Sequence, residues 1–205
     1  MVFVKHIIMN TRQLTMPMFP LGLVLLPGET TKLHIFEERY KQLINECLNN
    51  EASFGVPYIE KGIITDFGCE VKIKRILKTF ENGEMDVLIE GTNLFKLVEY
   101  SKVLTPKLYG AGIIEHINIS QKIQLNNLQD AVVNYFGTVQ NQFIDYDTVA
   151  ALSVYNVASS LQLTHPEKYR LISSRNQQLH LLNQIKFINH IINTENQIKD
   201  RFINN

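Results

Sequence analysis

Residues 19–46, FPLGLVLLPGETTKLHIFEERYKQLINE, change their hydrophobic pattern twice and decide the fold of the first half of the chain. Two extended apolar runs flank Pro27-Gly28, a dipeptide typical of tight turns. Leu33 and Ile35 alternate with polar residues, which predicts a strand with one buried face. Over 37–50 the apolar residues recur every three or four positions. We therefore expect two strands joined by a turn, and then a helix.

The next seventy residues predict further strands. The strongest local signal is a β-hairpin, because two alternating segments flank Asn82-Gly83. The two hairpin segments are 69–80 and 85–91, and three further extended segments are 54–59, 93–100 and 109–117. Six or so short strands with one helix indicate a small, mostly antiparallel barrel or pseudo-barrel.

From about Ser120 onward, helical spacing replaces the alternating pattern. The spacing predicts a long amphipathic helix over 125–143 and a second one capped by Asp145 or Asp147. A capping box, Thr164 to Glu167 with Pro166 in its first turn, predicts a short helix. Ser174 with Gln177 predicts the start of a last long helix. The fold class is therefore α+β, with an N-terminal extension (1–13), a β-rich subdomain (14–118) and a helical bundle (119–205).

Charge and cysteine content exclude several classes of protein. The 205 residues contain 20 Lys and Arg and 20 Asp and Glu, and the balance holds in both halves. Nucleic acid is an unlikely partner, because phosphate contacts require concentrated positive charge. The chain has two cysteines, which favours free thiols in a reducing compartment. No apolar run is long enough to span a membrane, and no signal peptide is recognisable, so we expect a cytoplasmic protein.

Motifs for catalysis, cofactors and metals are missing. The sequence contains no phosphate-binding G-x-x-x-x-G-K-[ST] or G-x-G-x-x-G motif, and no H-E-x-x-H or C-x-x-C motif. His34 and Glu37 lie three residues apart without an obvious third ligand. Cys47 falls on the apolar side of a predicted helix, and Cys69 begins a strand, so packing explains both thiols. We expect no catalytic residues, no cofactor and no metal.

The opening stretch resembles the signature of the Lon protease N-terminal domain family, F-P-L-x2-V-x2-P-G followed by L-x-I-F-E-x-R-Y. The matching residues are Phe19-Pro20-Leu21, Val24, Pro27-Gly28, Leu33, Ile35-Phe36-Glu37 and Arg39-Tyr40. Further similar segments are 54–56, 68–71, 91–97 and 109–115, with a looser match over 167–185. One departure is Asn93-Leu94 before Phe95, where the family often has Arg. The resemblance covers about residues 14–190.

The resemblance implies a fold and a function. The family's β part is similar to PUA-like pseudo-barrels and is followed by a helical bundle. Neither an ATPase nor a Ser-Lys peptidase module is present in these residues, so it implies a stand-alone, non-enzymatic module that captures unfolded or exposed apolar polypeptide. The candidate polypeptide-binding residues are Leu21, Leu23, Leu25, Leu26 and Phe36. Two alternatives remain open: RNA binding by the PUA-like part, and a pocket for a small molecule.

The expected partners are unfolded or extended polypeptides and a separate protease or ATPase. A homo-oligomer is a further hypothesis, because the apolar stripe of the last helix continues through Ile191 and Ile198 to Phe202.

Overall fold

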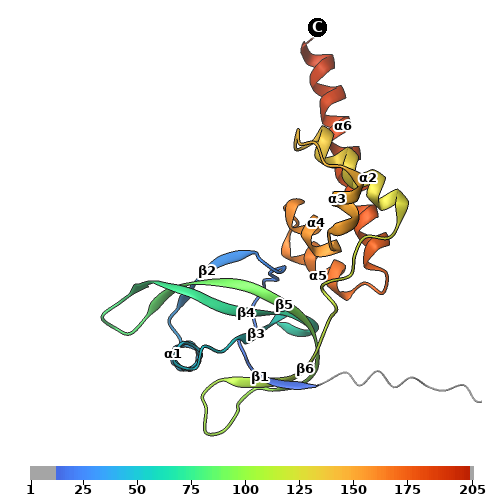
Figure 1. Ribbon diagram of the computed structural model, residues 1–205. Coiled ribbons are helices and arrows are strands. Elements are labelled where there is room, and N and C mark those ends of the chain that lie inside the picture. Colours follow the sequence, from blue (N-terminus) through green and yellow to red (C-terminus); the bar gives the residue numbers. More distant parts are fainter. Residues whose placement is uncertain (1–12, 204–205) are drawn as a thin grey trace, which may run out of the picture. The chain divides into compact units, whose positions relative to one another are not determined.

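The computed structural model describes residues 13–203, with side chains described up to Glu195. The chain divides into two compact units, each drawn in Figure 1. The β unit contains residues 13–23 and 30–117. The helical unit contains the segment 24–29 and the chain from Asn118 onward. Part of the opening stretch therefore belongs to the second unit.

The β unit is a six-stranded sheet that closes on itself. Its strands are β1 (Leu14–Met18), β2 (Thr30–Ile35), β3 (Phe54–Glu60), β4 (Ile63–Thr79), β5 (Met85–Ser101) and β6 (Gly110–His116). The strand order is β2-β5-β4-β3-β1-β6, and β5 also pairs with β6. Five strands thus form a ring, with β2 added at its edge. All pairings are antiparallel except β1 with β3, which confirms the predicted α+β, mostly antiparallel pseudo-barrel.

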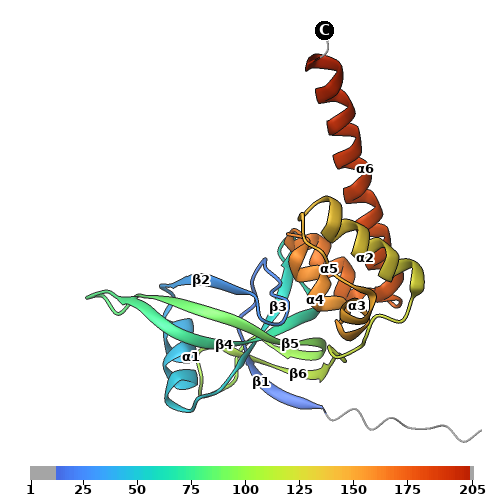
Figure 2. The same cartoon turned by 45° about the horizontal axis from the view of Figure 1, so that its top comes forward.

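The β4–β5 hairpin is the longest feature of the sheet (Figure 2). Its turn is built around Asn82-Gly83, as predicted: Phe80 N donates to Glu84 O (2.9 Å), and Gly83 has a φ of 78°. Each strand has 17 residues, so the prediction of short strands was wrong here. The segment 93–100 continues β5 instead of forming a strand of its own. Register shifts along β4 and β5 let such long strands bend enough to close the ring.

The core of the β unit forms from the inward residues of the strands. Met16, Met18, Phe95 and Ile114 cluster with no more than 8% of any side chain exposed. Helix α1 (Glu38–Asn49) confirms the predicted helix and buries its apolar face. Phe19 stacks on Tyr40 of α1 with ring centroids 3.7 Å apart. Two aromatic residues of the signature are therefore core residues, and their contact holds the segment after β1 against helix α1.

The helical unit contains five helices. They are α2 (Asn126–Thr138), α3 (Tyr146–Ala151), α4 (Val154–Ser160), α5 (His165–Ser173) and α6 (Gln177–Ile203). The Asp145 cap and the Thr164 capping box are confirmed. The predicted second helix is split, because Ser153 opens α4 with a capping box of its own. Asn176, rather than Ser174, caps α6 by accepting from Leu179 N (3.1 Å).

The segment 24–29 is not the strand that its apolar pattern predicts. Val24, Leu25 and Leu26 are all buried, so they do not alternate between a buried and an open face. The Glu29 carboxylate receives two contacts from Lys168 Nζ (2.6 and 2.8 Å) and one from Leu26 N (2.8 Å). Since Lys168 is a buried residue of α5, these contacts fix the segment within the helical unit.

Candidate functional site

The structure does not bring the five sequence-predicted binding residues together. Leu25 and Leu26 are 3% and 0% exposed within the helical unit, so neither offers a surface in this conformation. Leu21 and Leu23 are half-buried in the β unit, where Leu21 N donates to Pro57 O (3.2 Å) beside β3. Phe36 is 59% exposed. Of the five residues, only Phe36 presents most of its side chain to solvent.

Phe36 lies beside an exposed polar cluster at the edge of the sheet. The His34 ring is 6.1 Å from the Phe36 ring and 5.7 Å from the Phe80 ring, measured between centroids. His34 Nδ1 lies 2.7 Å from the Asp86 carboxylate, and Nε2 lies 3.3 Å from that of Glu84. The hydrogen bond to Asp86 raises the pKa of His34. No group of three His, Cys, Asp or Glu residues suited to a metal ion occurs among the described residues.

An exposed apolar surface lies on the β5–β6 loop (residues 102–109), for which the sequence had suggested no role. Val103, Leu104 and Leu108 are 57%, 41% and 56% exposed. The signal in the sequence that could have revealed this surface is a cluster of aliphatic residues in a connection between two strands. Such side chains are usually buried or replaced by polar ones in loops, so their exposure here marks a candidate contact surface.

Polar contacts fasten this loop to helix α1. One Glu46 carboxylate oxygen accepts from Lys107 Nζ (2.7 Å), and the other accepts from the Tyr109 hydroxyl (2.5 Å). Gln42 adds a contact by accepting from Leu108 N (2.9 Å). The hydrogen bond from Lys107 is the main reason why the pKa of Glu46 is lowered, and burial raises the pKa of Tyr109. The loop therefore holds its apolar side chains in a defined position.

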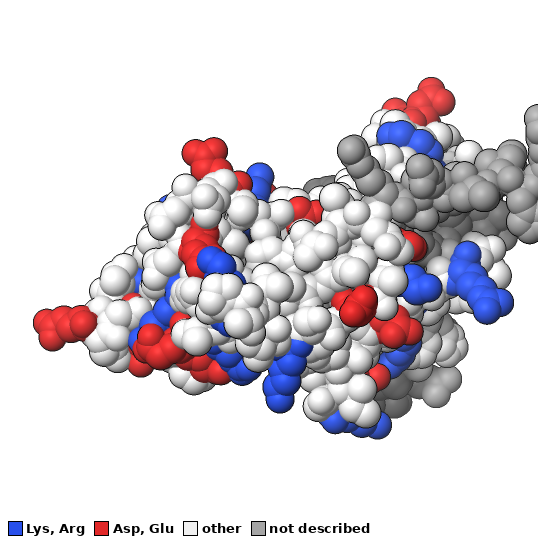
Figure 3. All heavy atoms as spheres, turned by 90° about the horizontal axis from the view of Figure 1, so that it is seen from below, with Lys and Arg blue, Asp and Glu red and all other residues white. Residues whose placement is uncertain are grey.

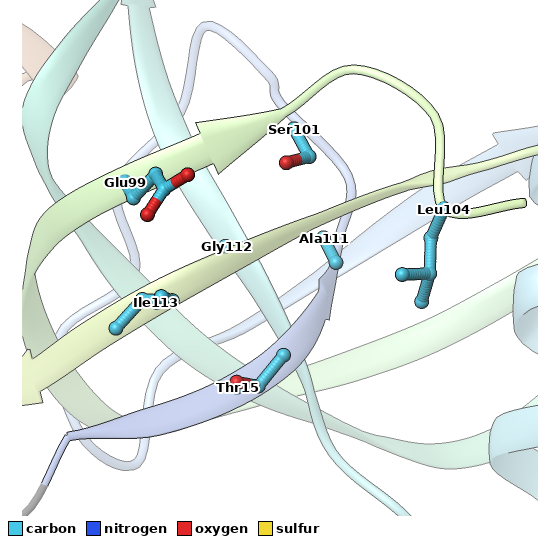
Figure 4. A pocket seen from close by; sticks show the side chains of 7 residues that line it. All are labelled: Thr15, Glu99, Ser101, Leu104, Ala111, Gly112 and Ile113. Carbon is cyan, nitrogen blue, oxygen red and sulfur yellow. The ribbon is translucent and has the colours of Figure 1, made fainter.

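A hollow of about 170 Å³ opens on the outer side of the ring next to this loop (Figure 4). Strand β6 supplies Ala111, Gly112 and Ile113, and Leu104 of the loop closes one side. The remaining lining residues are Thr15 of β1 and Glu99 and Ser101 of β5. We call this cavity the β6 hollow. A larger hollow of about 460 Å³ borders the same loop at Pro106 and Leu108, and most of its other lining residues are polar.

The two thiols have no arrangement for nucleophilic chemistry. Cys47 and Cys69 are both buried, and neither forms a disulfide within the described part of the chain. Burial raises the pKa of the Cys47 thiol to about 11, so it stays protonated near neutral pH. Because the thiolate is the reactive form, this environment suppresses reactivity. The packing role predicted for both residues agrees with their burial.

On the face shown in Figure 3, charges of both signs are interspersed. The basic positions of β4 illustrate this pattern. Lys72 and Lys74 both pair with the Glu90 carboxylate, at 3.2 and 3.1 Å. Lys78 lies over the Phe80 ring, 4.3 Å from its centroid. The alternating lysines of this strand therefore have local partners and do not form a free basic strip.

Comparisons with known proteins concern the fold and the family of the chain. Among the described residues, no helix has the length and hydrophobicity needed to span a membrane. The family model of the ATP-dependent protease La (LON) substrate-binding domain matches residues 15–199. A search of curated proteins found no match.

Two solved structures share the fold. A Lon N-terminal domain protein from Xanthomonas campestris has a TM-score of 0.66 and 24% identity, covering 84% of this chain and 98% of that one. The N-terminal domain of Mycobacterium avium complex Lon protease has a TM-score of 0.58 and 11% identity, with 83% and 97% covered. Because the family model matches residues 15–199 of the 205-residue chain, the chain belongs to the family of ATP-dependent protease La (LON) substrate-binding domains.

Proposed function

We propose that this protein is a non-catalytic module that binds unfolded or extended polypeptides through exposed apolar side chains. Membership of a substrate-binding family carries the proposal. The substrate of a protease is a polypeptide. The described residues contain no recognisable metal cluster, and burial raises the pKa of the Cys47 thiol, so neither feature suggests chemistry of another kind.

The surface of the β unit supports this proposal. Its exposed large apolar residues are Leu14, Phe36, Ile63, Ile76, Val98, Val103, Leu104 and Leu108. Unfolded chains differ from folded ones mainly by the apolar side chains and backbone groups that they expose, so apolar contacts give the needed discrimination. The zero formal net charge fits binding that depends little on salt.

The expected partners follow from the same proposal. A module that captures polypeptide without hydrolysing it requires a separate protease or ATPase, and we place both in the cytoplasm. A homo-oligomer through α6 remains a proposal: Phe187 and Ile191 are 60% and 40% exposed, four residues apart on one face. The side chains of Ile198 and Phe202 lie outside the described residues. Light scattering that gives 23.6 kDa at all concentrations would contradict self-association.

The first test is fluorescence anisotropy with labelled α-lactalbumin in two forms. The reduced and alkylated form stays unfolded, whereas the disulfide-bonded form is folded. We expect binding of the unfolded form alone, with little change between low and moderate salt. Equal binding of both forms, or of neither, would contradict the proposal. A labelled single-stranded RNA serves as the comparison, because RNA binding would weaken steeply with salt.

A further inference from the structure

We propose that the β6 hollow receives one aliphatic or phenyl side chain of an extended polypeptide, and that Glu99 pairs with a Lys or Arg next to that residue. This inference rests on the proposed function and names the segments that the module prefers. The hollow, the free carboxylate and the fixed loop each contribute an independent argument.

The size of the hollow selects a single side chain. Its volume is about 170 Å³. An apolar cavity of ~150 Å³ in another protein accommodates benzene, whereas pockets for drug-sized ligands measure ~300–1,000 Å³. A Leu, Ile, Met or Phe side chain therefore fits the space. A cofactor or a folded protein surface does not.

The lining of the hollow matches such a side chain. Ala111, Ile113 and Leu104 present aliphatic atoms. Thr15 and Ser101 are exposed and place hydroxyl groups at its rim. These hydroxyls can donate to or accept from the backbone of a polypeptide that crosses the rim. An apolar interior with a polar rim suits an inserted side chain whose own backbone stays at the surface.

Glu99 gives the site its charge preference. It is the one charged residue among the seven that line the hollow. Its carboxylate makes no ion pair or hydrogen bond within the described part of the chain, unlike Glu46, Glu70 and Glu90 on the same unit. An exposed carboxylate beside an apolar hollow favours a cation near the inserted side chain. The preferred segment therefore combines one apolar residue with a neighbouring Lys or Arg.

The loop supplies a preformed wall. Leu104 N donates to Tyr109 O (2.9 Å), and the Tyr109 hydroxyl is bonded to Glu46. The wall residue is thus connected through Tyr109 to helix α1. A site whose wall is already ordered loses less conformational entropy on binding than a flexible loop would.

The experiment uses the whole protein, labelled with ¹⁵N, and a nine-residue peptide of Ser and Thr with Leu-Lys at its centre. Matched peptides carry Ala-Lys or Leu-Glu. We expect the Leu-Lys peptide to shift the amide signals of Leu104 and of residues 111–113. The Ala-Lys peptide should bind ~tenfold or more weakly, because it buries less apolar area. The Leu-Glu peptide should bind ~two- to fivefold more weakly.

Variants test whether the hollow itself, and not the surface around it, binds the peptide. A111L fills the space and L104S removes the wall, so both should reduce binding of the Leu-Lys peptide by ~tenfold. Glu99→Lys should reverse the preference between the Leu-Lys and Leu-Glu peptides. L179S is the matched control, since Leu179 is an exposed leucine of α6 (46%) that does not line the hollow. The ¹⁵N spectrum of each variant away from the loop reports whether it is folded.

The outcomes distinguish this inference from the proposed function. If unfolded α-lactalbumin binds the protein but A111L and L104S leave peptide binding unchanged, the hollow is not the site and only this inference fails. If unfolded α-lactalbumin does not bind at all, the proposed function fails and the inference fails with it. Loss of peptide binding in both hollow variants, with L179S unaffected, would establish the inference.

Discussion

Replacing Lys168 by Met tests whether the segment 24–29 is held in the helical unit by the Glu29–Lys168 pair. Lys168 Nζ contacts both Glu29 oxygens, at 2.8 and 2.6 Å, and the two side chains are only 10% and 18% exposed. Met retains most of the aliphatic length of Lys but removes the charge. Glu29 then keeps Leu26 N as its contact, a neutral donor that cannot replace an ammonium group.

The expected cost follows from this geometry. Removing one partner of a fully buried ion pair costs ~3–5 kcal/mol, because the other charge stays desolvated. Since both side chains retain some access to water, we expect K168M to lower the free energy of unfolding by ~2–3 kcal/mol. The double variant E29Q/K168M buries no unpaired charge. It should therefore recover more than half of the loss.

Urea unfolding followed by circular dichroism at 222 nm measures these effects, since most helices lie in the unit that contains both residues. Lys74→Met is the matched control: Lys74 also pairs with a carboxylate (3.1 Å), but its side chain is 42% exposed. Its removal should cost less than ~1 kcal/mol. If K168M unfolds at the same urea concentration as the wild type, or if the double variant is as unstable as K168M, the reasoning is wrong.

Three further outcomes follow from contacts within the β unit. Gly68→Ala should lower the free energy of unfolding by ~2–3 kcal/mol in urea, because its new methyl group would meet backbone atoms of β3 that cannot move aside. The pKa of Glu46 in the folded protein is lower than its ordinary value of 4.5. Its carboxylate therefore contributes fully to holding the β5–β6 loop above pH 4.5, and this contribution is lost as the pH falls through the pKa of the folded protein. Hydrogen exchange of the loop amides should therefore accelerate on acidification in the wild type, but show no such step in Glu46→Gln. Cys47 and Cys69 should react with a thiol reagent at pH 8 only after denaturation, so rapid labelling of the native protein would contradict their burial.

Local signals in the sequence predicted the elements whose stability is local. The Asn82-Gly83 hairpin, helix α1 and the caps at Asp145 and Thr164 are examples. Each depends on residues within a few positions, so spacing and capping rules apply directly. The closure of the ring could not be predicted in this way. It depends on β1 pairing with β3 and with β6, which both lie far from it along the chain.

The candidate site was harder to predict than the fold. Leu25 and Phe36 look equally apolar in the sequence, yet one is 3% and the other 59% exposed. Hydrophobicity records how strongly a side chain prefers burial but not which neighbours cover it. The β6 hollow depends on how the β5–β6 loop folds beside its two flanking strands and near β1, which is far from it in the sequence. Its volume is a property of that packing and has no local sequence signal.

The signature residues and the proposed site occupy different parts of the chain, because the signature residues mostly build the fold. Phe19 and Tyr40 stack in the β unit, and Val24 is buried in the helical unit. The β6 hollow takes its wall from the β5–β6 loop, which falls between the segments 91–97 and 109–115 that resemble the family. Loops tolerate substitution better than core positions, since fewer packing contacts constrain them. We therefore expect changes at Leu104 of this loop, or at the exposed Glu99 near the end of β5, to alter which polypeptide is preferred without disturbing the residues that mark the family.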